Sequence, residues 1–94
     1  MAEQTISGIE VRKPFSSDPN ALNVSHWPVW TKECSVFDWV YDERETCLFL
    51  EGKVMVRTQS GEVFMGSGDM VTFAKGLKCT WHVLEPVKKH YCFG

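Results

Sequence analysis

The fold of this chain is decided by two stretches of its sequence, Trp39-Val-Tyr-Asp-Glu-Arg-Glu-Thr-Cys-Leu-Phe-Leu-Glu-Gly52 and Gly68-Asp-Met-Val-Thr-Phe-Ala-Lys-Gly-Leu-Lys-Cys79. Each reads as strand sequence bounded by a glycine turn. Residues 53–67 separate the two stretches and contain one hairpin signal, Gln59-Ser-Gly61. Short strands joined by such turns are typical of a β-barrel or a β-sandwich.

Short strands are predicted along the rest of the chain as well. Alternating or apolar patterns mark them at residues 9–12, 33–41, 46–50, 53–58, 62–65, 70–73, 78–84 and 88–93. Pro86 is expected to separate the last two strands, because proline cannot donate to a strand ladder. Residues 1–8 are expected to be a flexible end. No segment has helical periodicity, so the sequence predicts an all-β fold.

The composition argues against several classes of function. The 94 residues suffice for a single domain, residues 1–94. A formal net charge of −2 argues against nucleic acid or an anionic membrane as a partner. No apolar run is long enough for a membrane-spanning helix, and the first residues lack the pattern of a secretory signal. We therefore expect a cytoplasmic protein with reduced cysteines, or a protein of an organelle such as the plastid if a transit peptide has been removed.

The two stretches resemble the two sequence motifs of the cupin family. The first cupin motif ends in a glutamate ligand, six residues and a glycine, and Glu45 and Gly52 stand at that spacing. The second motif opens with a glycine and reaches another glycine shortly before its last ligand, as Gly68 and Gly76 do here. The spacing and the strand pattern of both motifs are therefore present.

The resemblance is closest to the small cupins of the ethanolamine-utilisation and ureidoglycine-aminohydrolase-like group. Their pattern is Trp-x-Tyr-Asp-x-x-Glu-Thr-Cys, then Leu-Glu-Gly, then Lys-Gly-Leu-x-Cys-x-Trp, and it is matched at residues 39–47, 50–52 and 75–81. The resemblance implies a small cupin-type β-barrel, which is a double-stranded β-helix of two antiparallel sheets. Motif 1 then lies at about residues 39–52 and motif 2 at about residues 68–79.

Most of the residues that bind metal in cupins are replaced in this chain. The positions of the two histidines of the first motif hold Trp39 and Tyr41, and the position of the last histidine holds Cys79. Only Glu45 is kept. We therefore expect no cofactor, with a transition metal held by Glu45, Cys47 and Cys79 as the alternative.

Strand alternation from Glu45 predicts which side chains face the lumen of the barrel. The expected lumen contains a carboxylate, a phenol, two thiols and two indoles, from Trp39, Tyr41, Glu45, Cys47, Cys79 and Trp81. The indoles and thiols are also explained as ordinary side chains of the hydrophobic core. Glu45 is harder to explain in that way, because a buried carboxylate must be paired, hydrogen-bonded, protonated or solvated.

Three functions are compatible with such a lumen. The first is the binding of a small polar or cationic metabolite, with Trp39 and Trp81 as cation–π walls and Glu45 as its anchor. The second is an enzyme, either metal-independent with Glu45 and Tyr41 as catalytic residues or a metal-assisted hydrolase or isomerase. The third is a structural homodimer through the first strand and residues 27–30, whose proline and tryptophans suggest an apolar edge.

Overall fold

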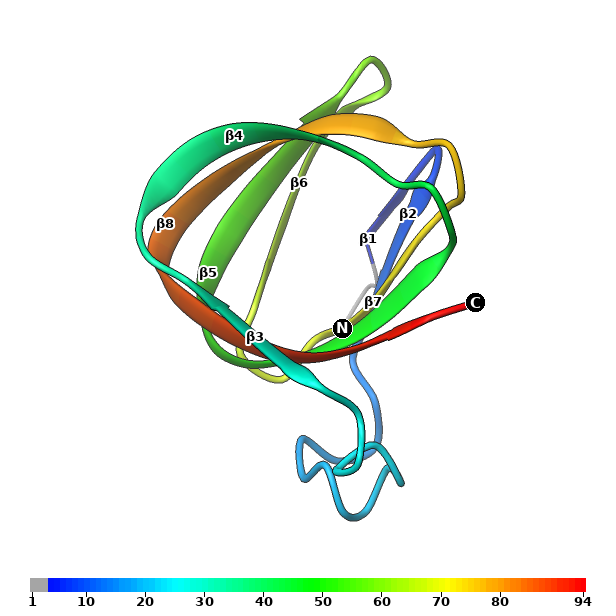
Figure 1. The fold of residues 1–94 in the computed structure, drawn as a ribbon, viewed down its shortest axis with the longest axis vertical. Helices are drawn as coiled ribbons and strands as arrows, with labels where there is room; N and C mark the ends of the chain where they lie inside the picture. Colours follow the sequence, from blue (N-terminus) through cyan, green and yellow to red (C-terminus); the bar gives the residue numbers. More distant parts are fainter. Residues whose placement is uncertain (1–3) are drawn as a thin grey trace.

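The computed structural model describes residues 4–94, which form antiparallel strands and no helix, so the predicted all-β fold is confirmed. No helix in this range is long and apolar enough to cross a membrane. Figure 1 shows that the strands curl around a common centre. The strands are β1 (Gln4–Ile6), β2 (Ile9–Arg12), β3 (Val29–Lys32), β4 (Ser35–Val40), β5 (Glu45–Thr58), β6 (Gly61–Gly66), β7 (Met70–Phe73) and β8 (Lys78–Phe93).

Two long strands organise the barrel. β5 has 14 residues and β8 has 16, and they pair with each other along most of their length. β8 also pairs with β4 through its first half and with β3 through its second half, whereas β5 pairs with β6 and β7. The two facing layers expected from the sequence are therefore parts of one continuous eight-stranded sheet, joined through β5 and β8 (Figure 1).

The predicted break at Pro86 does not occur. β8 runs through Pro86, and the irregularity appears as register shifts opposite residues 49–54 of β5. Gly52 lies at these shifts with a φ of 96°, and a Cβ atom there would lie 2.3 Å from the carbonyl oxygen of Pro86. Only glycine accommodates both the positive φ and this close approach, so Gly52 lets the two strands bend together.

The N-terminal part contains an additional strand. β1 pairs with β2, although residues 1–8 were expected to form no regular structure, and residues 1–3 lie outside the described range. Residues 27–30, whose sequence suggested an apolar edge, lead into the edge strand β3. Pairing with a neighbouring strand satisfies the backbone N–H and C=O groups of both segments.

The core of the barrel is formed by apolar and aromatic side chains. Trp81, Tyr41, Phe49 and Phe73 are the largest fully buried ones. Tyr41 stacks on Phe73 with ring centroids 4.7 Å apart, and Phe73 lies 5.7 Å from Trp81. Large rings fill a small interior efficiently.

Candidate functional site in the barrel lumen

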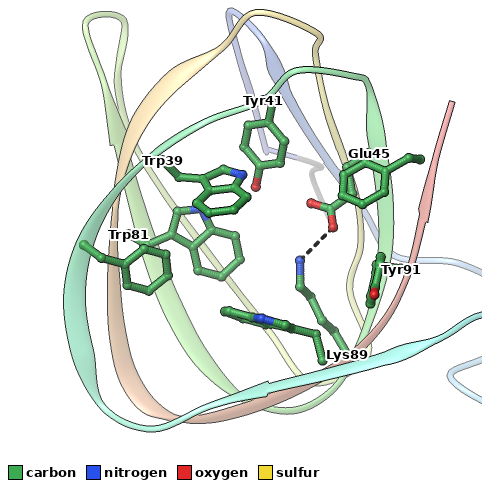
Figure 2. Close-up of a pocket in the computed structure, with 9 residues that line it drawn as sticks. Trp39, Tyr41, Glu45, Trp81, Lys89 and Tyr91 are labelled. Atoms are coloured by element: carbon green, nitrogen blue, oxygen red, sulfur yellow. Dashed lines mark hydrogen bonds and ion pairs between the residues drawn. The ribbon is translucent and has the colours of Figure 1, made fainter.

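A cavity of about 240 Å³ lies in the lumen and opens to solvent. Figure 2 shows its nine lining residues, which are Trp30, Phe37, Trp39, Tyr41, Glu45, Trp81, Lys89, Tyr91 and Phe93. Four of the six lumen residues predicted from the sequence are among them: Trp39, Tyr41, Glu45 and Trp81. The predicted Cys47 and Cys79 are buried but do not line the cavity.

Glu45 is placed in the lumen by the pairing of three strands. It is the first residue of β5 and lies opposite Phe73 of β7 on one side and Phe93 of β8 on the other. Residues directly opposite each other in a sheet point to the same face, so the carboxylate projects between two aromatic rings. Glu45 is only 5% exposed, which makes an unpaired charge there costly.

Lys89 provides the partner for this charge. Its Nζ atom lies 3.2 Å from Glu45 Oε2 and donates a second hydrogen bond, 3.1 Å long, to the Sγ atom of Cys47 (Figure 2). The two charged side chains are 5% and 6% exposed, so this is a buried ion pair. Lys89 lies in β8 opposite Phe49 of β5 and Trp30 of β3, which directs its side chain into the lumen.

Aromatic rings surround the Lys89 ammonium. Its Nζ atom lies 5.0 Å from the ring centroid of Trp81 and 5.1 Å from that of Trp30, and it lies 5.9 Å from Phe49 and from Phe73. Cation–π contacts at these distances stabilise a desolvated cation. The expected binding of a ligand cation against Trp81 is therefore disfavoured, because the protein's own ammonium already occupies that face.

Tyr41 lies above the ion pair. It follows β4 and is fixed by two backbone hydrogen bonds, from its amide to Leu77 O at 2.9 Å and from the Gly76 amide to its carbonyl at 2.6 Å. Burial, with the Glu45 charge adding to it, raises the pKa of the Tyr41 phenol far above its usual value. The hydroxyl therefore stays protonated, and Figure 2 shows it directed into the lumen.

Trp81 and Trp39 form one wall of the cavity. Trp81 is 2% exposed, and its Nε1 atom has no hydrogen-bond partner among residues 4–94. Trp39 is 48% exposed and stands at the cavity mouth, in T-shaped contact with Tyr41 at 6.4 Å. One indole is thus a fixed part of the lumen, whereas the other is accessible to solvent at its entrance.

The two buried thiols are not activated. Burial raises the pKa of Cys47 to about 12, although the Lys89 charge opposes the shift, and burial raises the pKa of Cys79 to about 11. The Cys79 thiol donates to the carbonyl oxygen of Trp39 at 3.7 Å. Both groups are neutral thiols near neutral pH, which makes them poor nucleophiles and poor metal ligands.

The residues at the cupin metal positions do not fit a metal ion. Within residues 4–94, no three side chains of histidine, cysteine, aspartate or glutamate are placed to hold one. The alternative ligand set of Glu45, Cys47 and Cys79 is therefore not assembled. The Lys89 ammonium also contacts Glu45 directly, and a fixed cation at that carboxylate repels a second cation.

Sequence reasoning missed five residues that line the cavity: Trp30, Phe37, Lys89, Tyr91 and Phe93. A signal for Lys89 was present. Cys79 and Trp81 were expected to face inward, and the same alternation continued through Pro86 reaches residue 89. The strand end predicted at Pro86 interrupted this alternation, so Lys89 was not assigned to the lumen.

Comparison with known proteins agrees with the fold. The family profile described as the EutQ-like cupin domain matches residues 19–91. A DUF861 family protein from Thermotoga maritima is 50% identical with a TM-score of 0.85, and the match covers 92% of this chain and 99% of that one. No curated protein matches the chain.

Two more distant structures carry the name EutQ. The EutQ protein of Clostridium difficile is 18% identical with a TM-score of 0.65, over 90% of this chain and 66% of that one. A putative ethanolamine utilization protein from Salmonella typhimurium is 14% identical with a TM-score of 0.65, over 98% and 65% of the two chains. These two similarities concern the fold alone. From the profile match and the Thermotoga relative, the chain belongs to the EutQ-like cupin domain family, also described as DUF861.

Proposed function

We propose that this protein is a small-molecule binding module that holds a flat, polar organic molecule in its barrel lumen without a metal ion. The observation that carries the proposal is the Lys89–Glu45 ion pair at the wall of a cavity whose other lining residues are aromatic. Binding sites for small molecules are typically apolar concavities with a few convergent polar groups. The lumen has this composition.

The size of the cavity limits the ligand. A volume of about 240 Å³ is below the range of about 300–1,000 Å³ that is usual for drug-sized ligands. A single-ring compound or a short-chain metabolite suits it, whereas a dinucleotide does not. Trp39, which is 48% exposed at the mouth, offers a flat face against which a planar molecule packs.

The polar groups of the lumen are better suited to holding a ligand than to moving protons. Glu45 is bound to Lys89, and the raised pKa of Tyr41 keeps the phenol protonated. General acid–base catalysis is most efficient with groups that titrate near the working pH. Catalytic roles for Glu45 and Tyr41 stay a prediction, and binding is the function that the geometry favours.

The four tryptophans make a direct test of the site. Trp30, Trp39 and Trp81 line the cavity, whereas Trp27 does not. We expect phenylacetamide, added to ¹⁵N-labelled protein, to shift the indole N–H resonances of the three cavity tryptophans. Trp27 serves as the internal control, and its resonance should stay in place.

The same titration with Glu45→Gln and Glu62→Gln separates the lumen from the surface. Glu62 forms an exposed ion pair with Arg57, so its variant applies the same substitution outside the cavity. The Glu62 variant should behave as the parent, whereas the Glu45 variant should change the affinity. If single-ring compounds of different charge leave all indole resonances unmoved at millimolar concentration, the lumen is a filled core and the proposal is wrong.

A further inference from the structure

The lumen contains one full positive charge and one full negative charge side by side. Lys89 and Glu45 are the only charged residues that line the cavity among those the structure describes, and they lie 3.2 Å apart. Their charges cancel at a distance, but each still presents its own sign to a molecule that touches it. The site is therefore neutral overall and strongly dipolar.

Each partner of the ion pair keeps hydrogen-bonding capacity. An ammonium has three donors, and Lys89 uses one toward Glu45 Oε2 and one toward Cys47 Sγ. The carboxylate of Glu45 accepts the Lys89 bond through Oε2 only. Figure 2 shows the other oxygen directed into the cavity on the side of Tyr41. Among the described residues, one donor of Lys89 and one oxygen of Glu45 are thus left unused, and both residues line the cavity.

From this arrangement we infer that the lumen selects a neutral ligand with adjacent acceptor and donor groups, of which a primary amide is the simplest chemical class, over both anions and cations. The amide oxygen accepts from the Lys89 ammonium while the amide N–H donates to Glu45. The inference rests on the proposed function and specifies its ligand class. In it, the ammonium of Lys89 serves as the fixed cation of a lumen that does not fit a metal ion.

Ligands of either charge are disfavoured by the same pair. A carboxylate that approaches Lys89 also approaches Glu45, and an ammonium that approaches Glu45 also approaches Lys89. The aromatic faces do not compensate a second cation, because the Trp81 and Trp30 rings already lie about the Lys89 ammonium at 5.0 and 5.1 Å. A neutral amide meets neither repulsion.

Three compounds with the same ring and a two-carbon side chain separate these possibilities: phenylacetamide, phenylacetate and 2-phenylethylamine. With the native protein, calorimetric titration should give phenylacetamide the tightest binding, by about tenfold over either charged compound, which is the value of one hydrogen bond to a charged group. Equal affinity for all three compounds would overturn the inference. It would leave the proposed function intact, because the ring would still bind.

Two variants should then reverse the order in opposite directions. Glu45→Gln leaves the Lys89 ammonium without its counter-charge, so phenylacetate should become the preferred compound. Lys89→Met leaves the Glu45 carboxylate alone, so 2-phenylethylamine should become the preferred compound. The controls are Glu62→Gln and Lys88→Met, where Lys88 is the neighbour of Lys89 in β8, and both should keep the native order.

The Glu45 variant decides the inference even if Lys89→Met does not fold, because it retains the shape of the side chain and a hydrogen-bond acceptor. A shift of its preference to phenylacetate supports the inference. An unchanged order in a folded Glu45→Gln protein overturns it, since the charges of the lumen would then not determine the ligand. If none of the compounds binds the native protein, the proposed function itself fails.

Discussion

The Lys89 ammonium lies 3.2 Å from Glu45 Oε2, although the two residues are 44 positions apart in the sequence. They are brought together by the pairing of β5 with β8, in which Phe49 lies opposite Lys89 and Phe93 opposite Glu45. Glu45 stands at the position of the glutamate ligand in the cupin motif, and its carboxylate is neutralised by the chain's own lysine. The barrel thus has a charge pair where the family pattern has a metal site.

The effects of Lys89 and Glu45 substitutions on the free energy of unfolding should depend strongly on each other. Lys89→Met leaves a carboxylate buried and unpaired, which should lower the free energy of unfolding by about 3–5 kcal/mol. The double variant Lys89→Met/Glu45→Gln should recover a large part of this loss, because no uncompensated charge remains. Urea denaturation of the native protein, both single variants and the double variant measures the coupling.

The matched control is the exposed pair of Arg57 and Glu62, whose side chains are 54% and 44% exposed. The corresponding substitutions there should cost only about 0–1 kcal/mol, as is usual for surface ion pairs. Equal losses at the two pairs would mean that the lumen is solvated and that Lys89 and Glu45 do not depend on each other.

Gly52 should be among the least replaceable residues of the fold. Gly52→Ala forces a positive φ on a residue with a Cβ atom and places that atom 2.3 Å from Pro86 O. A loss of more than about 3 kcal/mol is expected, since the backbone strain of about 1–3 kcal/mol is increased by the clash. Chemical denaturation measures it.

Gly76→Ala is the control for the steric part of this effect. Gly76 also has a positive φ, 84°, but a Cβ atom there would meet nothing within 4 Å. The loss of stability in Gly76→Ala should be limited to the backbone strain of a residue with positive φ. If Gly76→Ala costs as much as Gly52→Ala, the close approach of β8 to Gly52 is not what requires the glycine.

The inward direction of Glu45, Cys47 and Trp81 could be predicted from the sequence, because strand alternation is a local property. The need of Glu45 for a partner followed from the cost of a buried charge. The identity of the partner did not follow. Lys89 comes after Pro86, and only the continuous pairing along β8 carries the register across that residue.

Trp30 illustrates a second limit. Residues 27–30 looked like an exposed apolar edge, but Trp30 packs on Trp81 with ring centroids 5.7 Å apart and lines the lumen. Local sequence shows that such a segment is apolar, whereas the face that covers it depends on β3 pairing with the distant β8. Long-range strand pairing is the information that a local pattern lacks.

Alkaline pH should destabilise the protein, because two buried thiols and a buried phenol ionise more readily in the unfolded chain. The pKa of Cys47 is raised from 9.0 to about 12 and that of Cys79 from 9.0 to about 11, and the pKa of Tyr41 is raised as well. The folded state therefore binds more protons than the unfolded state above pH 9, and its stability must fall as the pH rises from about 9 toward 12. Melting temperatures across this range should decline.

Cys47→Ala should make that decline shallower, since one buried group that ionises only in the unfolded chain is removed. Cys34→Ala, at an exposed thiol, is the control and should leave the slope unchanged. A slope that Cys34→Ala alters as much as Cys47→Ala would contradict the assigned burial of Cys47.

A homodimer stays a prediction, and fewer apolar side chains are left for its interface than the sequence suggested. Trp30 is used within the barrel, but Phe15 is 84% exposed and Val29 of the edge strand β3 is 45% exposed. Edge strands with apolar side chains tend to be covered by a partner. Sedimentation velocity should show a dimer that Val29→Lys converts to a monomer, whereas a monomeric native protein at tens of micromolar would refute it.

The most direct test of the account is a crystal structure determined with phenylacetamide. The amide group should lie on the Lys89–Glu45 pair, with its oxygen within hydrogen-bond distance of Lys89 Nζ and its nitrogen near the free oxygen of Glu45. The ring should pack against Trp39 at the cavity mouth. A metal ion bound to Glu45, a Lys89 side chain directed out of the lumen, or a ligand located only on the outer surface would contradict the account.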